Sequence, residues 1–152
     1  MSGAQTGGCL CGALRFEISE LMPAAAHCHC SMCRKFHGAG FATIVGVPAS
    51  QFKWITQTDT LKTYVAANET TRSFCGECGS SLLFASPRAP SDIIEVALGV
   101  FDDDVPVLPD AHIFVESGAA WAAPRDGLPA FQAGRNSPLV NANVSSSSLD
   151  SE

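Results

Sequence analysis

Apolar and polar residues alternate along much of the chain with the period of two that is typical of half-buried β-strands. In residues 13–19 (ALRFEIS), Leu14, Phe16 and Ile18 share one face, and the charged residues between them share the other. Similar stretches contain many Val, Ile, Phe, Thr and Tyr residues, which pleated surfaces prefer. These further strand candidates are residues 41–47, 61–66, 81–85, 92–100 and 112–117.

Helical signals are short. Ser31 can cap a single turn through residues 32–36, and Pro48 can open another turn over residues 48–52. No segment carries a sustained apolar stripe with helical period. We therefore predict a mainly β fold class, with several short antiparallel sheets around one core and few helical turns.

The domain organisation follows from length and from a change in composition. A chain of 152 residues has the length of one domain. After Gln132 the sequence AGRNSPLVNANVSSSSLDSE is rich in small polar residues and has little apolar surface to bury. We predict one folded domain over residues 1–132 and a disordered polar tail over residues 133–152, without an internal repeat.

Charge and hydropathy argue against two classes of partner. The net charge is −6, and the nine Lys and Arg residues are scattered rather than gathered into the basic face that nucleic acid requires. No apolar run reaches the ~18 residues of a membrane-spanning helix. The first residues, MSGAQTGG, have neither the basic nor the apolar region of a secretory leader. We predict a cytoplasmic protein in a reducing compartment, with no nucleic-acid and no membrane partner.

Cysteine carries the strongest chemical signal. Every cysteine has another two or three positions away, which suits local chelation better than disulfides between distant segments. In a reducing compartment disulfides rarely persist, and clustered thiols more often bind metal. The seven residues are Cys9 and Cys11, then Cys28, Cys30 and Cys33, and finally Cys75 and Cys78.

Two of these groups together suit a closed structural site. The pair in CGECG (75–79) resembles a metal knuckle, in which Gly76 and Gly79 tolerate the left-handed dihedrals of a tight turn. The pair in CLC (9–11) sits at alternate positions, which face the same way in an extended segment. Two pairs supply the four thiolates of a tetrahedral structural zinc site.

The remaining trio, Cys28, Cys30 and Cys33, lies within HCHCSMC. Three protein ligands with an open fourth position are the arrangement of a catalytic zinc. A nearby histidine could instead close the fourth position and make a second structural site; the candidates are His27, His29 and His37, of which His37 is the most credible. An iron–sulfur cluster is a further alternative, although the spacings match neither ferredoxin pattern.

Charge indicates the chemistry of such a trio. Zinc with three thiolates is a net anion and a poorer Lewis acid than zinc bound by imidazoles, so it suits a soft ligand such as a thiol. Held there as a thiolate, the thiol becomes a positioned nucleophile, which points to making or breaking a carbon–sulfur bond. Arg34 and Lys35 could offset the negative charge or bind a carboxylate of the thiol. The alternative is that they are a solvated surface pair.

Four segments resemble a known family when they are taken together. They are GGCLCGALRFEI, HCHCSMCRKFHGAGFA, RSFCGECGSSLLF and HIFVESGAAWAAPRDGLPAF. Their combination is similar to the glutathione-dependent formaldehyde-activating enzyme (GFA) family, which shares its domain with centromere protein V. The resemblance runs from about Gly7 to Gln132 and includes all seven cysteines in the family's order and spacing.

The resemblance implies a fold of coiled β-sheets similar to the Mss4-like group, with two zinc ions per chain. The structural zinc would be held by Cys9, Cys11, Cys75 and Cys78, and the catalytic zinc by Cys28, Cys30 and Cys33. The family's founding activity joins glutathione to formaldehyde as S-hydroxymethylglutathione, and its members are grouped as carbon–sulfur lyases. The implied partners are a small thiol and an aldehyde. The competing hypothesis is a non-catalytic zinc-binding or interaction module with two structural sites.

Three other residues carry weaker signals. His112 is interpreted as packing or as the wall of a pocket, in preference to a proton carrier. We expect Trp121 in the core, and Arg72 covering the sheet near the knuckle rather than reaching a substrate carboxylate.

Overall fold

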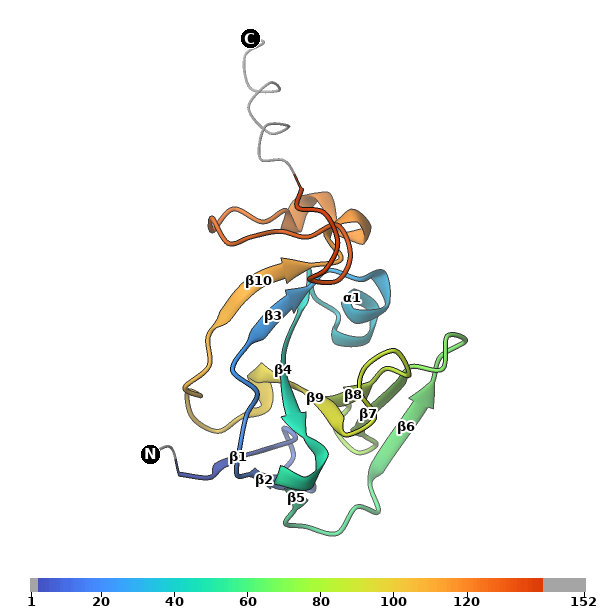
Figure 1. The fold of residues 1–152 in the computed structure, drawn as a ribbon. Helices are drawn as coiled ribbons and strands as arrows, with labels where there is room; N and C mark the ends of the chain where they lie inside the picture. Colours follow the sequence, from blue (N-terminus) through green and yellow to red (C-terminus); the bar gives the residue numbers. More distant parts are fainter. Residues whose placement is uncertain (1–2, 141–152) are drawn as a thin grey trace, which may run out of the picture.

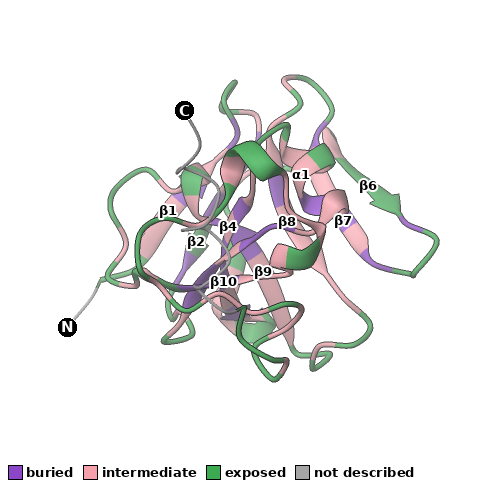
Figure 2. Ribbon diagram, turned by 90° about the horizontal axis from the view of Figure 1, so that it is seen from above, coloured by how far each residue is buried: buried purple, intermediate pink, exposed green. Residues whose placement is uncertain are grey.

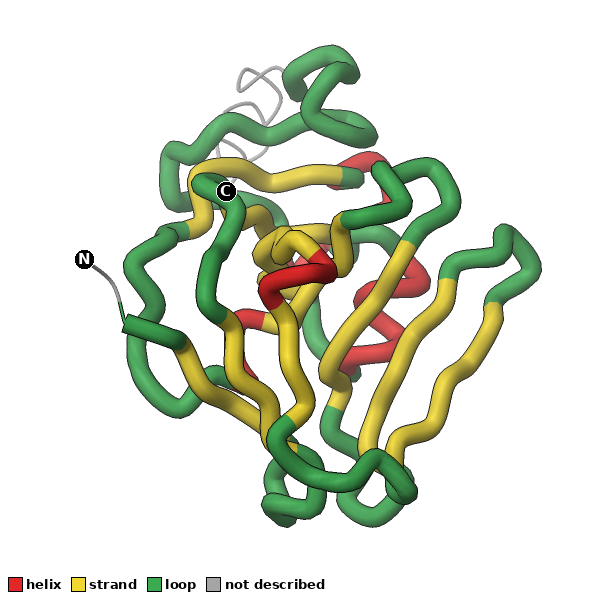
Figure 3. The backbone as a smooth tube through the Cα atoms, turned by 60° about the horizontal axis from the view of Figure 1, so that its bottom comes forward, coloured by secondary structure: helices red, strands yellow, loops and turns green. Residues whose placement is uncertain are grey.

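The computed structural model describes residues 3–140, which form mainly strands joined by loops and short helical turns (Figures 1 and 3). A three-stranded sheet has the order β1-β2-β5. Its strands are β1 (Gln5–Gly8), β2 (Arg15–Ile18) and β5 (Phe52–Trp54). The mainly β prediction is therefore confirmed.

A seven-stranded sheet has the order β10-β3-β4-β9-β8-β7-β6. Its strands are β3 (Ala25–Cys28), β4 (Ala42–Pro48), β6 (Leu61–Val65), β7 (Thr71–Cys75), β8 (Ser81–Ala85), β9 (Ile93–Ala97) and β10 (Pro109–Ile113). Neighbouring strands are antiparallel except β10 and β3, which run parallel. The chain thus returns late in the sequence to place β10 beside β3.

Five of the six predicted strands coincide with observed ones, and the sixth is displaced. Residues 112–117 were expected to be extended, but β10 ends at Ile113 because Phe114 has a left-handed φ of 56°. A 3₁₀ turn, η3 (Val115–Ser117), follows, and η4 (Ala120–Ala122) comes soon after. Two other 3₁₀ turns are η1 (Ala49–Gln51), inside the predicted turn at 48–52, and η2 (Leu98–Val100).

Helix α1 (Ser31–His37) is the one α-helix among the described residues, and it is longer than the predicted single turn. Cys30, rather than Ser31, occupies its N-cap position. The helix ends at Gly38, which adopts the left-handed conformation (φ 61°, ψ 38°) that glycine enters without steric cost. Two cysteines of the predicted trio therefore belong to the start of α1.

The main core lies where the two sheets meet. Phe16 and Ile18 of β2 pack against Val45 and Val47 of β4 and Val96 of β9. The ring centroids of Phe16 and Phe52 are 5.2 Å apart. Buried segments gather at the centre of the molecule, and exposed loops surround them (Figure 2).

The segment after β10 lies across the end of β3 and β10 (Figure 1). The backbone N–H of His112 donates to the carbonyl of Pro129 at 2.8 Å. Arg135 donates to the carbonyl of Ala25 at 2.9 Å and pairs with Asp110 at 2.6 Å. The predicted boundary at Gln132 falls inside this segment, and residues 141–152 of the predicted tail lie outside the described part of the chain.

None of the helices within residues 3–140 combines the length and the apolar character that crossing a bilayer requires.

Candidate metal centres and their surroundings

Two tight turns present the four-cysteine group. Cys75 ends β7, and the knuckle closes through the N–H of Gly79, which donates to the Cys75 carbonyl at 2.8 Å. Gly79 has a φ of 78°, as the knuckle prediction requires. The same expectation is wrong for Gly76, whose φ is not positive. Gly76 is instead required for close approach, since a Cβ there would lie 2.7 Å from Lys62 and 3.0 Å from the Thr60 carbonyl.

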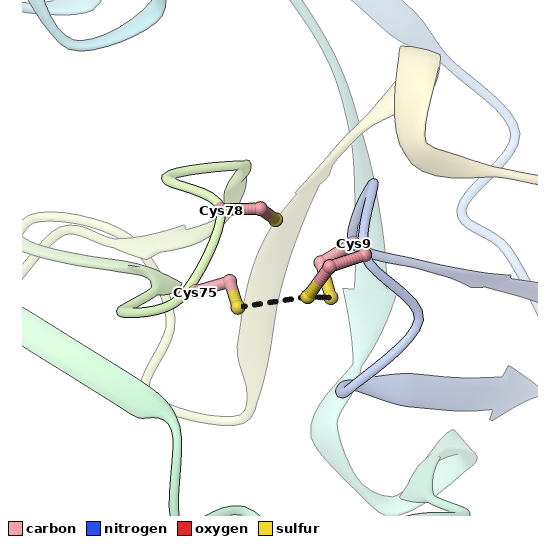
Figure 4. A group of neighbouring side chains, drawn as sticks. Cys9, Cys75 and Cys78 are labelled. Carbon is pink, nitrogen blue, oxygen red and sulfur yellow. Dashed lines mark hydrogen bonds between the residues drawn. The ribbon is translucent and has the colours of Figure 1, made fainter.

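The other turn joins β1 to β2 and carries Cys9 and Cys11. The N–H of Leu10 donates to the Ser80 hydroxyl at 2.9 Å, which joins this turn to the knuckle. Figure 4 shows Cys75 and Cys78 on one turn facing Cys9 on the other. The two turns therefore bring together cysteines that are far apart in the sequence, as Cys11 and Cys75 are by 64 positions.

The sulfur separations fit a tetrahedral zinc site. Sγ of Cys11 lies 3.6 Å from that of Cys9 and 3.8 Å from that of Cys75. All four ligand atoms of Cys9, Cys11, Cys75 and Cys78 are within 4.8 Å of one another. Four sulfurs at ~2.3 Å from a central ion would be about 3.8 Å apart. The predicted set of four thiols can thus hold zinc with little rearrangement.

The trio is built differently, from one short segment. Cys28 ends β3, Cys30 caps α1, and Cys33 lies inside α1. Cys28 and Cys33 are each 4% exposed and pack with Ala42 and Ile44 in an apolar cluster, whereas Cys30 is half-buried. The three sulfurs do not all fall within 4.8 Å of one another, unlike those of the four-cysteine group.

Arg72 stands beside the trio, which the sequence interpretation missed. Its side chain is 5% exposed, and Nη2 lies 3.9 Å from Sγ of Cys33. The hydrogen bond from the Cys28 thiol, together with Arg72, lowers the pKa of Cys33 to about 6, although burial opposes the shift. The same hydrogen bond and burial raise the pKa of Cys28. Cys33 is therefore prepared as a thiolate, the form of cysteine that binds metal.

The rest of the Arg72 guanidinium and one further ionisable group, Glu95, complete the surroundings of the trio. Nη1 of Arg72 is buried and has no hydrogen-bond partner among the described residues. The guanidinium lies 6.0 Å and 5.9 Å from the ring centroids of Phe36 and Phe84. Burial, and then the charge of Cys33, raises the pKa of Glu95 to about 7. Arg72 is thus the cation that opposes the negative charge of this region.

The two cations predicted beside the trio have different environments. Arg34 donates from Nη2 to the Ser117 carbonyl at 3.0 Å, which ties α1 to η3. Lys35 is exposed and lines a cavity of about 750 Å³, together with Phe36 and His37 of α1 and Ser80 of the knuckle loop. Lys35, and not Arg34, is therefore placed to meet a ligand in this cavity.

The three histidines considered as a fourth ligand make other contacts. Nδ1 of His27 bonds to the Thr43 hydroxyl at 2.8 Å, and Nε2 of His29 bonds to Nδ1 of His112 at 2.8 Å. The ring of His37 stands edge-on to Phe36, with 5.2 Å between centroids. Burial lowers the pKa of all three, that of His29 to about 4, so their imidazoles are neutral near pH 7.

A cluster that the sequence did not reveal forms around His112. Its Nε2 lies 2.9 Å from a carboxylate oxygen of Asp126, and the ligand atoms of His27, His112 and Asp126 are all within 4.8 Å of one another. No spacing motif links these three positions. Trp121 was expected in the core, but it is 77% exposed, because η4 lies at the surface.

Comparisons with known proteins agree with the cysteine pattern. Residues 4–117 match the family model described as glutathione-dependent formaldehyde-activating enzyme. A Halomonas elongata protein provisionally named as such an enzyme is 30% identical over 125 residues, which cover 76% of this chain and 77% of that protein. An uncharacterised lyase of Schizosaccharomyces pombe is 28% identical over 79 residues, covering 52% of this chain and 56% of the lyase.

The fold also matches a solved structure. A crystal structure of a Rhodobacter sphaeroides protein superposes with a TM-score of 0.57 at 25% sequence identity. The match covers 66% of this chain and 91% of that one. The arrangement of short coiled sheets is therefore shared with an experimentally determined structure.

Proposed function

This chain belongs to the glutathione-dependent formaldehyde-activating enzyme family, and from that premise we propose that it is a zinc-dependent carbon–sulfur lyase. Glutathione or a related thiol would be added to formaldehyde or another small carbonyl, or released from the adduct. The lyase name of one relative supports this reaction class. We place the reaction in the cytoplasm, where thiols of both protein and substrate stay reduced.

We propose two zinc ions per chain with different roles. Cys9, Cys11, Cys75 and Cys78 would hold a structural ion, and the separations of their sulfurs support this assignment. Cys28, Cys30 and Cys33 would hold a second ion. Bound there, zinc would supply a coordination position for the incoming thiol and lower the pKa of that thiol.

The observation that carries the proposal is the contact between Arg72 and Cys33. A buried guanidinium 3.9 Å from a thiolate offsets the net negative charge that three thiolates leave on zinc. Among residues 3–140, no buried arginine or lysine lies beside the four-cysteine group, whose two turns are partly at the surface. The half-buried Cys30 marks the side from which a substrate can approach.

The chain's own groups can guide both substrates. Lys35 offers a positive charge in the 750 Å³ cavity next to α1, which matches a carboxylate of glutathione. Nη1 of Arg72 has an unused N–H, which can donate to a substrate oxygen at the trio. In the addition, the thiol sulfur forms a bond to the carbonyl carbon. The carbonyl π electrons move to oxygen, and that oxygen takes up the proton lost by the thiol.

Exchange spectroscopy on mixtures of glutathione and formaldehyde tests this proposal. The protein should speed exchange between free glutathione and its adduct, and Cys30→Ser should abolish the acceleration while the four-cysteine zinc remains bound. Lys35→Ala should raise the glutathione concentration needed for half-maximal acceleration. Lys53→Ala removes an exposed lysine on β5, away from the cavity lining, and should have no effect.

An absence of acceleration across a panel of thiols and aldehydes, with two zinc ions bound, would contradict the enzyme proposal. It would favour the non-catalytic zinc-binding module instead.

A further inference from the structure

A histidine cluster occupies the face of the large sheet opposite to Cys28. His27 and Cys28 are consecutive on β3, so their side chains point to opposite faces. In the sheet register His27 is opposite Thr43 on β4 and His112 on β10. The rings of His27 and His112 stand 4.8 Å apart between centroids. Parallel pairing of β10 with β3 thus brings the two imidazoles together.

Hydrogen bonds engage one nitrogen of His27 and both nitrogens of His112. Nδ1 of His27 contacts the Thr43 hydroxyl, and Nδ1 of His112 contacts Nε2 of His29, each at 2.8 Å. Nε2 of His112 lies 2.9 Å and 3.0 Å from the two carboxylate oxygens of Asp126. Nε2 of His27 has no hydrogen-bond partner among the described residues, and its ring lies 4.5 Å from that of Phe41 and 4.8 Å from that of His112 between centroids.

We propose that His27, His112 and Asp126 form a third metal site, which binds a divalent first-row transition ion such as Zn²⁺, Fe²⁺ or Co²⁺. Two imidazole nitrogens and one carboxylate are a donor set that these ions accept with open positions remaining. The ligand atoms of the three residues already lie within 4.8 Å of one another. The site is distinct from both cysteine groups.

The surrounding contacts are those that a bound ion requires. A histidine that ligates through one nitrogen normally donates its other N–H to a fixed acceptor, which orients the ring. Thr43 is that acceptor for His27, and Nε2 of His29 is that acceptor for His112. The hydrogen-bonded chain from Asp126 through His112 to His29 would explain two of the histidines without metal, but it does not include His27, whose ring packs against that of His112. An ion uses all three ligands.

The proposed site lies at the edge strand β10, and one of its three ligands is accessible to solvent. His112 is 2% exposed, and the side chain of Asp126 is 46% exposed. Three ligands, one of them exposed, should bind more weakly than four thiolates do. We therefore expect an exchangeable ion in addition to the two zinc ions of the cysteine groups.

Cobalt titration of the purified zinc-containing protein tests the site. One equivalent of Co²⁺ should bind with weak visible absorption and without the strong near-ultraviolet charge-transfer band that sulfur ligands produce. Asp126→Asn should weaken the binding of Co²⁺ measured by calorimetry by more than tenfold. Its side chain is half exposed, so the fold should persist. Asp104→Asn, which removes an exposed carboxylate outside the cluster, is the matched control and should leave the affinity unchanged.

A second variant separates orientation from ligation. Thr43→Val keeps the shape of β4 but removes the hydroxyl that orients His27, and losses of ~10–100-fold are typical for such partners. Three results would overturn the third site: no cobalt binding, a charge-transfer band that shows displacement of zinc from thiolates, or equal affinity in wild type and Asp126→Asn. Each is independent of thiol–aldehyde exchange, so the proposed enzyme activity can stand or fall separately.

Discussion

The two cysteine groups are assembled in opposite ways. The four-cysteine group joins two turns from distant parts of the sequence, and its sulfurs converge within 4.8 Å. Cys9 and Cys75 pack in an apolar cluster with Leu14 and Leu82, whereas Cys11 is exposed. The trio comes from six consecutive positions, is lined by apolar residues, and has the buried cation Arg72 against Cys33. Because its ligands come from distant positions, we propose that the first group is a metal clasp that stabilises the fold. We propose that the trio, with its local ligands and its charged neighbour, serves the chemistry instead, and that the fold does not depend on it.

Cys75→Ser should have the largest effect. Cys75 is fully buried and connects the knuckle to the β1–β2 turn through its sulfur contact with Cys11. Binding of structural zinc contributes ~10–16 kcal/mol to the folding of small zinc peptides, and domains have only ~5–15 kcal/mol of net stability. We expect loss of zinc and of the cooperative thermal transition, measured by metal analysis and circular dichroism.

Cys30→Ser is the matched substitution in the trio and should leave the protein folded. Cys30 is half-buried at the start of α1, and its zinc would clasp only neighbouring positions of one segment. We expect a Tm within a few degrees of the wild type and one zinc ion per chain rather than two. If Cys75→Ser and Cys30→Ser unfolded the protein to the same extent, the four-cysteine group and the trio would not differ in their importance for the fold.

Arg72→Met should weaken zinc binding at the trio without unfolding the protein. Methionine keeps most of the side-chain volume between Phe36 and Phe84, and it removes the unpaired Nη1. Without the guanidinium the pKa of Cys33 should rise from about 6, and the loss of a charged contact worth ~1.5–3 kcal/mol should weaken the second zinc about tenfold or more. Competition with a chromogenic chelator measures this affinity.

Two controls accompany that variant. Arg72→Lys restores a positive charge and should recover part of the affinity, whereas Arg88→Gln changes an exposed arginine and should do nothing. Equal weakening of the zinc in the four-cysteine group would show that Arg72 acts through the fold as a whole and not through Cys33.

The sequence predicted those strands whose own residues alternate, and missed strands that depend on partners. β2 (Arg15–Ile18) shows clear alternation, whereas β1 (Gln5–Gly8) reads QTGG and is extended because it pairs with β2. Gly8 is required there, since a Cβ would lie 2.2 Å from the Leu14 carbonyl. The displaced end of β10 depends on the backbone of Phe114, which an apolar pattern does not report.

The candidate metal ligands could be recognised in the sequence for a related reason. Chelating cysteines repeat at short, fixed spacings, so both groups were visible as patterns in the sequence. Arg72 reaches Cys33 from β7, and Asp126 reaches His112 from a loop after η4. Such contacts depend on strand order and on parallel pairing of β10 with β3, neither of which follows from local spacing.

We expect the smallest effect from Asp102, which contacts the hairpin that carries two cysteines of the four-cysteine group. Asp102 accepts a hydrogen bond from Thr6 of β1 at 2.7 Å and two hydrogen bonds from Arg15 of β2, one of them at 2.8 Å. These contacts stabilise the hairpin that carries Cys9 and Cys11. These contacts, that of Arg15 foremost, hold the pKa of Asp102 at about 2, below its ordinary 3.8.

A carboxylate whose pKa is lowered by folding stabilises the native state above its ordinary pKa, and this contribution disappears as pH falls through the folded value. Wild-type Tm should therefore lose this contribution between pH 4 and pH 2, and Asp102→Asn should show a smaller decline across that window. Asp59→Asn, an exposed carboxylate outside the hairpin, should follow the wild-type curve. Because Asp102 is at the surface, salt should reduce the difference. If Tm declined identically in Asp102→Asn and in the wild type, the carboxylate of Asp102 would not stabilise the hairpin. Strand pairing and metal binding alone would then hold it, and the four-cysteine group would depend on zinc more than we propose.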